Sequence, residues 1–358
     1  MPSPAVIESP RTYRAIDEAI HAIPIEWFKP SPGVYWMDLF VSATIGWTTL
    51  ALAVRAAGWS RAALLVVAVF ALYRAVLFIH EITHRPRRDV PAFTLVWNAL
   101  VGVPLLIPSF LYEGVHTDHH RQRCYGTEAD PEYVPFGRRP PLLIAGCALA
   151  SLLAPVAFPV RFGILAPLSW AVPALRRPIA ERCSALAINH RYVRRLPIDA
   201  SGRVQEVATF AVVWMAAWLW WLGALPGAAV FCWSVASAAA SGINALRTLA
   251  AHRYDCDSGE LSMTEQLLDS CTIAPTEGFA GRFSTGVTNV GRALIAPVGL
   301  RYHALHHWIP SLPYHNLGRA HRLLVATLRS DAPYHATVER GFAPAWRDLL
   351  RRSRTQSR

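Results

Sequence analysis

The sequence predicts an all-α integral membrane protein with about four transmembrane helices in two hairpins. Of its 358 residues, 53% are hydrophobic and only 16% are charged, whereas an ordinary soluble domain is about 25% charged. The mean hydropathy of +0.25 is also high. The apolar residues form blocks long enough to cross a bilayer, which takes roughly 20 residues. Clustered histidines between these blocks predict a histidine-rich cap on the cytoplasmic side.

Four apolar blocks are the expected membrane spans. Residues 34–57 and 62–82 form the first hairpin, with a short turn between them. Residues 207–225 and 227–250 form the second, with its turn at Pro226. The membrane domain as a whole is expected to cover residues 34–345. A cytoplasmic segment, 1–33, precedes it, and a basic tail, 346–358, follows it, with its last eight residues, "RRSRTQSR", expected to be frayed.

Two further apolar stretches are interrupted by proline. Residues 92–115 contain Pro104 and Pro108, and residues 142–170 contain three prolines. Proline removes a backbone donor and kinks or ends a helix. Such backbone survives at membrane depth only where protein covers it. We therefore expect both stretches to be kinked, re-entrant or interfacial.

Positive charge sets the expected orientation. Lys29 is the only lysine, so nearly all of the formal charge of +11 comes from arginine. The arginines cluster outside the two hairpin turns, apart from Arg61. By the positive-inside rule, both termini and the long middle region face the cytoplasm of the inner membrane. The first thirty residues show no apolar core of a signal peptide. The six cysteines form no C-x-x-C motif, which is typical of reduced packing residues.

The histidines are the strongest functional signal. Eight of the fourteen fall into three short motifs, "HEITH", "HTDHH" and "HALHH", starting at His80, His116 and His303. At this histidine frequency, chance would produce about half an H-x-x-x-H but only roughly 0.02 of an H-x-x-H-H. Positions i, i+3 and i+4 share a helix face, so each motif is expected to present its imidazoles as one cluster. His252 follows the last span on the same side of the membrane.

Nine clustered imidazoles indicate a metal centre. Ligands of this type suit zinc, iron, copper or nickel, and nine are too many for one ion and about right for two. The predicted ligands are His80, His84, His116, His119, His120, His252, His303, His306 and His307.

The first motif alone leaves other interpretations open. His-Glu-x-x-His is also the zinc-protease signature, with Glu81 as the base. Glu-x-x-His is half of a carboxylate-bridged di-iron site. A protease would leave six clustered histidines without a role, and the carboxylate site would leave the later motifs unused. A metal transporter would line a path through the membrane with its histidines, rather than gather them at one face.

The three motifs resemble the histidine boxes of the membrane fatty acid desaturase and hydroxylase superfamily, and "WIPSLPYHNL" resembles the stretch after the last box in bacterial acyl desaturases. The resemblance covers roughly His80 to Leu324. It implies a non-haem di-iron centre that uses O2 as co-substrate and abstracts hydrogen from an unactivated C–H bond. It also implies the eight box histidines as ligands, with His252 matching the extra histidine after the last span.

One position departs from the family pattern. Family members with that extra histidine can have an asparagine four residues before it, acting through water. Thr248 stands there in this chain, and Asn244 lies one turn earlier. We expect Asn244, Thr248 and His252 to form one helical stripe.

Other residues are expected to support the ligands. A metal-bound imidazole donates its second N–H to an oxygen, which sets its tautomer. The acidic candidates lie near the boxes in sequence, and His315 is a further candidate. The acidic residues are Glu81, Asp118, Asp130, Glu265 and Asp269.

The expected function is introduction of a double bond into a fatty acyl chain, with hydroxylation or ketolation of a lipid-like substrate as the alternative. The substrate would be an acyl lipid, an acyl-CoA or an acyl carrier. Electrons would come from a separate ferredoxin-like protein or a b-type cytochrome with its reductase. Membrane lipids are expected partners, and nucleic acid is not.

Two charges inside the first hairpin predict a local contact. Asp38 and Arg74 lie at similar depths on the two helices. Ionised side chains within a membrane are usually paired. We therefore predict an Asp38–Arg74 ion pair.

Overall fold

The structure is a computed structural model that describes residues 20–195, 197–256, 260–274 and 282–356. The described residues are mostly helical, and two short strands are their only strands. The chain forms two units, each treated separately below. Unit 1 consists of Met1–Ser31, His119–Ala145 and Leu246–Arg358, and unit 2 of Pro32–Asp118 and Gly146–Ala245.

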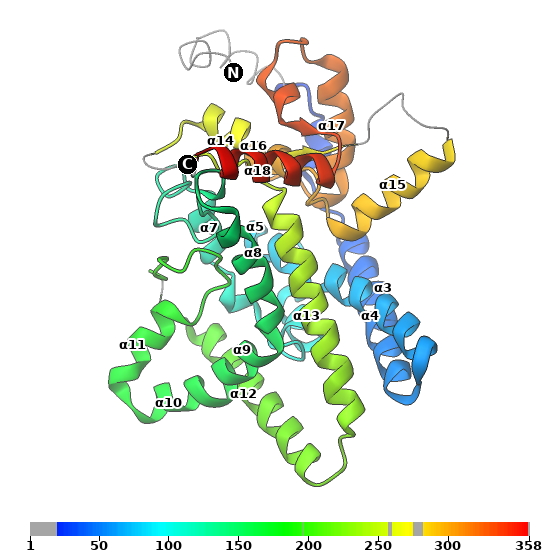
Figure 1. Cartoon of the computed structure of the whole chain (residues 1–358), viewed down its shortest axis with the longest axis vertical. Coiled ribbons are helices and arrows are strands. Elements are labelled where there is room, and N and C mark those ends of the chain that lie inside the picture. The colour runs from blue at the N-terminus through cyan, green and yellow to red at the C-terminus, as the bar shows by residue number, and fades with distance from the viewer. Residues whose placement is uncertain (1–19, 196, 257–259, 275–281, 357–358) are drawn as a thin grey trace. The chain divides into compact units, whose positions relative to one another are not determined.

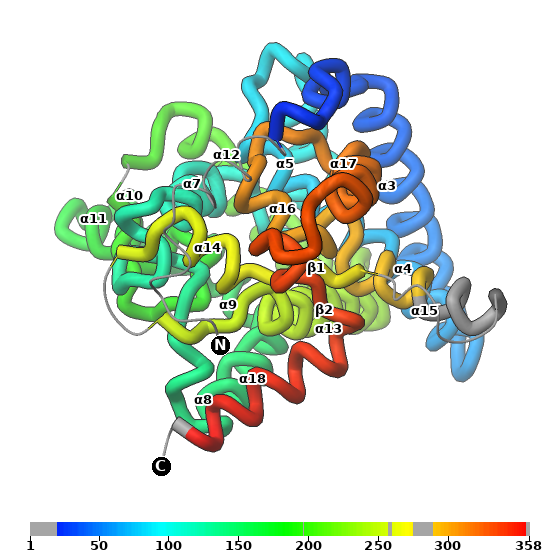
Figure 2. The backbone as a smooth tube through the Cα atoms, turned by 90° about the horizontal axis from the view of Figure 1, so that it is seen from above, coloured from blue at the N-terminus to red at the C-terminus, as the bar shows by residue number. Residues whose placement is uncertain are grey.

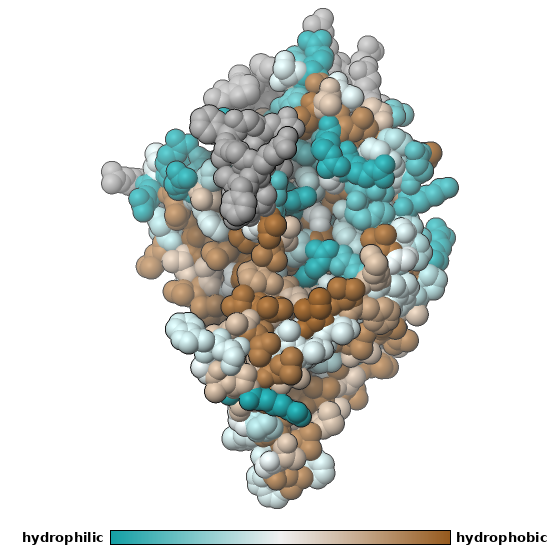
Figure 3. All heavy atoms as spheres, turned by 90° about the vertical axis from the view of Figure 1, so that its right-hand side faces the viewer, coloured by the Kyte–Doolittle hydropathy of each residue, from teal (hydrophilic) through white to brown (hydrophobic). Residues whose placement is uncertain are grey.

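Unit 2 begins with the expected first hairpin. Helix α3 (Pro32–Arg55) runs against α4 (Gly58–Val76), as Figure 1 shows. Gly46 permits this close packing, since a Cβ at that position would lie 2.7 Å from the Leu72 side chain. The outer faces of both helices are apolar (Figure 3). The short helix α5 (Phe78–His84) continues from α4.

The predicted ion pair of this hairpin is confirmed. Arg74 Nε donates to Asp38 Oδ1 at 2.6 Å, and its Nη2 donates to the other carboxylate oxygen. This bidentate geometry suits a planar guanidinium. The pair therefore ties α3 to α4 within their apolar surroundings.

The stretch after α5 is interrupted, as expected. It contains α6 (Phe93–Trp97), a π-helical turn (Asn98–Gly102) and a 3-10 turn (Ser109–Leu111). Trp97 is fully buried, and its indole N–H donates to the Ala75 carbonyl of α4. Protein therefore covers part of this irregular backbone.

The stretch from Pro141 to Ala171 is also interrupted. A 3-10 turn and a π-helical turn separate its three helices, which confirms the expected kinks. These are α8 (Pro141–Ala150), α9 (Ala154–Val160) and α10 (Ala166–Ala171), followed by α11 (Pro173–Arg182).

The last two long helices are α12 (Ala200–Trp221) and α13 (Gly227–Leu249). Residues 222–226 join them. Arg161 and Glu206 form a buried ion pair at 2.6 Å. This pair connects the π-helical turn Arg161–Leu165, which lies between α9 and α10, to α12.

Four segments of the described chain are long and apolar enough to cross a membrane. Three correspond to expected spans: Pro32–Arg55, Gly58–His84 and Gly227–Leu249. The fourth is Pro141–Ala171, which the sequence predicted as kinked or re-entrant. Helix α12 contains most of the expected span 207–225 but is not among the four. Its first two turns are polar, and tryptophan is frequent near its end. The chain is an all-α, membrane-embedded protein.

Unit 1 carries shorter helices. Figure 2 shows α14, α16 and the strands β1 and β2 close together. The strands are parallel, and Thr272 pairs with Val338. Helix α7 (Val115–His119) crosses from unit 2 into unit 1 along the chain. The other elements are α14 (Met263–Asp269), β1 (Thr272–Ile273), α15 (Arg282–Ile295), α16 (His303–Trp308), α17 (Tyr314–Thr327), β2 (Val338–Glu339) and α18 (Phe342–Gln356).

The prediction of a frayed C-terminal tail is wrong. Helix α18 extends to Gln356 and buries Phe342, Leu349 and Ser353 on one face. Arg352 Nη1 donates to Asp255 at 2.5 Å, and Ser353 Oγ donates to the Arg139 carbonyl. Because the segment is rich in arginine, the helical spacing of its buried residues was not recognised in the sequence.

Candidate metal centre

Unit 1 holds a compact group of four histidines. His119 ends α7, His252 follows α13, and His303 and His307 lie one turn apart on α16. All four are buried, and each offers a ring nitrogen within 4.8 Å of the others. We call this the four-histidine group.

The backbone around α14 positions the two segments that carry His252 and His303. A capping box of Ser262 and Glu265 starts α14. Just after it, Ser270 pairs with His252 in an isolated bridge, and Thr272 pairs with Tyr302 just before α16. This short stretch therefore brings the end of α13 and the start of α16 together.

Hydrogen bonds set the tautomers of two of the predicted ligands. His119 Nδ1 lies 2.8 Å from Asp130 Oδ1. Because an ionised carboxylate only accepts, His119 must donate from Nδ1, so its Nε2 is left to bind a metal. Gly126 N and Glu132 N also donate to Asp130, which holds that carboxylate in place.

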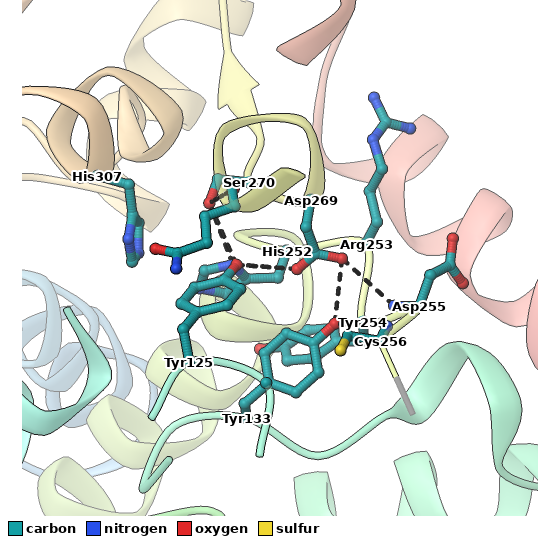
Figure 4. A network of polar contacts seen from close by, with 12 residues as sticks. Tyr125, Tyr133, His252, Arg253, Tyr254, Asp255, Cys256, Asp269, Ser270 and His307 are labelled. Atoms are coloured by element: carbon teal, nitrogen blue, oxygen red, sulfur yellow. Dashed lines mark hydrogen bonds and ion pairs between the residues drawn. The ribbon is translucent and has the colours of Figure 1, made fainter. Parts of the chain in front are cut away.

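His252 is oriented through a tyrosine. Tyr125 donates its hydroxyl hydrogen to Asp269 at 2.9 Å, and its oxygen lies 2.8 Å from His252 Nδ1. With its one hydrogen used, Tyr125 accepts from His252 Nδ1. Tyr133 donates to the other oxygen of Asp269 at 3.1 Å (Figure 4). His252 Nε2 is thereby also left to bind a metal.

The pKa shifts around this group have identifiable causes. Burial raises the pKa of Asp269 to about 6, although hydrogen bonds from Tyr125 and Tyr133 oppose the rise. Burial, and then the neighbouring imidazoles, lower the pKa of His307 well below its ordinary value. Burial opposes protonation of His119, but the Asp130 charge and hydrogen bond outweigh it and raise its pKa.

The four-histidine group fits a metal ion. Its Nε2 atoms form a chain in which His252 lies 2.9 Å from His303, and His307 lies 3.1 Å from both His303 and His119. Ligands about 2.1 Å from one ion lie about 3.0 Å apart at right angles, and about 3.4 Å apart at the tetrahedral angle. The spacing therefore matches neighbouring ligands at right angles better than a tetrahedral site. A cation would also satisfy lone pairs that otherwise face each other.

Unit 2 holds a second group, formed by His80 and His84 on α5 and His116 on α7. Their ring centroids lie 4.5 to 4.8 Å apart. Each offers a ring nitrogen within 4.8 Å of the others. Tyr112 Oη lies 2.9 Å from His116 Nδ1. This group has the donor type, though not the full ligand count, of a second metal site.

The last two box histidines contact each other in unit 1. The Nε2 atoms of His120 and His306 lie 3.1 Å apart. Both are on the predicted ligand list. The expectation that all nine histidines form one centre stays a prediction.

Two of the three boxes divide their histidines between groups, so the expectation of one cluster per box is wrong for them, whereas His80 and His84 of "HEITH" stay together. "HTDHH" sends His116 to the group in unit 2, His119 to the four-histidine group and His120 to His306. Different partners orient the rings, because Tyr112 Oη lies 2.9 Å from His116 Nδ1 and Asp130 Oδ1 lies 2.8 Å from His119 Nδ1. "HALHH" divides likewise, because His303 and His307 face the four-histidine group and His306 faces His120.

The helical stripe expected through Asn244, Thr248 and His252 is also wrong. Helix α13 ends at Leu249, so His252 lies beyond it. Thr248 Oγ1 accepts from Arg247 Nη2 at 3.0 Å. The proposed water-bridging role of Asn244 stays a prediction.

The other residues that the sequence predicted to support the ligands each have a different partner. Tyr35 donates to Glu81, and Arg85 Nε lies 3.8 Å from the same carboxylate oxygen. Tyr192 donates to the buried Asp118 at 2.9 Å. Glu265 caps α14. His315 Nε2 accepts from Ser31 N at 3.2 Å.

Sequence reasoning missed three tyrosines. Tyr112, Tyr125 and Tyr133 lie close to the second box in sequence but follow no recognisable spacing. Tyr125 and Tyr133 act through Asp269, which is more than a hundred residues away along the chain. Their position within about fifteen residues of the box, with Tyr112 before it and Tyr125 and Tyr133 after it, was the only available signal.

Comparisons with known proteins identify the family of the chain. The family model described as "Fatty acid desaturase" matches residues 56–338, which include all nine predicted ligands. A ceramide hydroxylase from Caulobacter vibrioides (strain NA1000 / CB15N) is 41% identical over 345 residues, covering 92% of this chain and 91% of the relative. No solved structure matches the chain significantly.

Proposed function

Since the chain belongs to the fatty acid desaturase family, and is a membrane-embedded oxidoreductase of the desaturase and hydroxylase superfamily, we propose that it hydroxylates ceramide. The observation that carries this proposal is the 41% identity to a ceramide hydroxylase over nearly the full length of both chains. In such a reaction, one oxygen atom of O2 enters the lipid and the other leaves as water. Two electrons and two protons are consumed.

Two iron ions are the proposed cofactors. His119, His252, His303 and His307 would hold one ion, and His80, His84 and His116 would contribute to holding the other. His120 and His306 complete the proposed ligand set. Bound iron would supply the O2 activation that oxidation of an unactivated C–H bond requires.

The protein's own residues would prepare the ligands. Asp130 and the Tyr125–Asp269 pair keep Nδ1 of His119 and of His252 protonated, and therefore direct Nε2 toward the ion. Oriented ligands of this kind raise metal affinity. Burial of the four-histidine group keeps water from its ligand nitrogens.

Desaturation is the second candidate. The family model is described by that activity, and the boxes are common to both reactions. Removal of two hydrogens from adjacent carbons would use the same ligands and the same electron supply. The two outcomes differ in where the lipid is held relative to the metal.

The proposed partners follow from the chemistry. Electrons would come from a ferredoxin-like protein or from a b-type cytochrome with its reductase. The arginine clusters outside the hairpin turns support an inner-membrane location with both termini in the cytoplasm.

Lipid analysis tests the proposal. The wild-type chain and the His306→Ala variant would be expressed in a bacterial host that contains ceramide, and lipids would be compared by mass spectrometry. We expect ceramide that has gained one oxygen atom with the wild type only. Ceramide that has lost two hydrogens would instead establish desaturation. Identical lipids from both strains would contradict both candidates.

A further inference from the structure

A cavity in unit 2 lies outside the histidine groups. Its volume is about 320 Å³, at the lower end of the usual range for ligand sites. The stretch after α5 and the first turns of α12 line it. Its apolar wall includes Phe93, Leu95 and Val204. A space of this size suits part of a lipid rather than a whole lipid with two chains.

Gln205 presents an oriented donor in this lining. Its Oε1 accepts from the backbone N–H of Phe110 at 3.0 Å, which determines which end of the carboxamide is oxygen. Its Nε2 makes one long hydrogen bond, 3.4 Å, to Ser201 Oγ. The amide group has two hydrogens. Among the described residues, the second hydrogen has no partner.

Two hydroxyl groups lie in the same lining. Ser201 Oγ has only the long contact with Gln205 among the described residues. Thr94 Oγ1 has no hydrogen-bond partner among the residues that the structure describes. Asn98, in contrast, is fully engaged with Thr94 O and with Ser109. The available polar groups are therefore one amide donor and two hydroxyls.

The charge at this cavity is balanced. Of the described residues that line it, Arg87 alone is charged, and its Nη2 lies 3.4 Å from Glu113 Oε2. Both side chains keep some exposure, at 63% and 30%. A phosphate would have to compete with Glu113 for Arg87. A neutral head group that exchanges hydrogen bonds matches the lining better.

The cavity is linked to the metal-ligand helix by aromatic contacts. Phe93 packs edge-on against both Phe78 of α5 and Tyr35 of α3, with centroids 5.6 Å apart in each case. Tyr35 in turn donates to Glu81 on α5. Phe93, which lines the cavity, therefore contacts Phe78 at the start of the helix that carries His80 and His84.

We propose that this cavity binds the uncharged amide and hydroxyl head region of the lipid substrate. The choice of ceramide as that lipid rests on the proposed function. Gln205 Nε2 donates to the amide carbonyl oxygen of the lipid, and Ser201 and Thr94 exchange hydrogen bonds with its hydroxyl groups. The apolar wall contacts the first carbons of the chains.

Photolabelling of the full-length protein in phosphatidylcholine nanodiscs tests this site. The probe is a short-chain ceramide with a diazirine near its amide, and a phosphatidylglycerol with the same diazirine chain is the comparison. We expect ceramide to label peptides within residues 87–98 or 201–205. The Thr94→Val/Ser201→Ala variant should be labelled about tenfold less, the effect of losing one to two hydrogen bonds.

Matched variants control for folding and charge. Thr49→Val/Ser60→Ala removes two hydroxyls that bond only nearby backbone carbonyls, and should be labelled like the wild type. Arg87→Gln should change ceramide labelling less than about twofold. Unchanged ceramide labelling in Thr94→Val/Ser201→Ala would overturn the proposal. Stronger phosphatidylglycerol labelling that Arg87→Gln abolishes would also overturn it, in favour of a phosphate site.

Labelling and catalysis can fail separately. If ceramide labels the cavity as expected but no oxidised ceramide forms, the proposed reaction is wrong and the head-group site stands. If ceramide is oxidised but Thr94→Val/Ser201→Ala is labelled as strongly as Thr49→Val/Ser60→Ala, the reaction stands and the head-group site is wrong.

Discussion

Tyr125 shows how one side chain decides the chemistry of another. A neutral imidazole can carry its hydrogen on either nitrogen. The Tyr125 hydroxyl gives its hydrogen to Asp269 and thereby requires a hydrogen on Nδ1 of His252. Asp130 has the same effect on His119 directly. The ligand set is thus prepared by residues that would not touch the metal.

Replacing Asp130 tests this preparation. Asp130→Asn keeps the shape of the side chain but removes the charge that orients His119. We expect a loss of about 10- to 100-fold in iron affinity, the usual effect at such positions, measured by competition with a chelator. Asp331→Asn, at an exposed ion pair with Arg329, is the control. Equal affinity in both variants would show that Asp130 has no such role.

Glu81 and His84 separate the oxidase from a zinc protease. Glu81 accepts from Tyr35, and we expect Glu81→Gln to lower iron content modestly and to retain activity. His84→Ala should lose activity altogether, because it removes a ligand. Both variants would be assayed for bound iron and for lipid oxidation. A Glu81→Gln variant that kept its iron but lost all activity would point to a catalytic glutamate.

Among the helices, long apolar blocks predicted some elements well, whereas residue composition failed to predict the C-terminal helix. The long apolar blocks predicted α3, the continuous segment of α4 and α5, and α13 to within a few residues. The C-terminal helix α18 was missed because its docking depends on single contacts, such as Arg352 with Asp255. The expected stripe on α13 failed because the chain pairs with Ser270 immediately after the helix ends.

The hairpin of α3 and α4 has a stability that can be measured. Asp38→Asn or Arg74→Met should each destabilise the protein by about 2 kcal/mol, since each leaves one polar partner in apolar surroundings. The double variant Asp38→Leu/Arg74→Met should recover most of this loss. Thermal unfolding in detergent would measure both effects. Arg329→Met, at an exposed pair, should have almost no effect, and similar losses in all variants would contradict this account.

For the whole molecule, metal content is the decisive measurement. We expect about two iron ions per chain, from the number and type of histidine ligands. Removing iron with a chelator should abolish lipid oxidation, and adding iron back should restore it. His303→Ala should lower the iron content, whereas the exposed His190→Ala should leave it unchanged. One zinc ion per chain in the active protein would contradict the di-iron assignment.

Composition and local spacing determined the class of the molecule and predicted its metal ligands. Bilayer thickness requires apolar blocks of a given length, and two H-x-x-H-H motifs in one chain are rare by chance, so both can be recognised from the sequence alone. Tertiary structure decided how the boxes divide, which nitrogen of His119 and of His252 carries the hydrogen, and that α18 is docked. Those outcomes depend on ring orientation and on contacts between residues far apart in the chain, such as Tyr125 with Asp269. Local periodicity contains no information about such contacts.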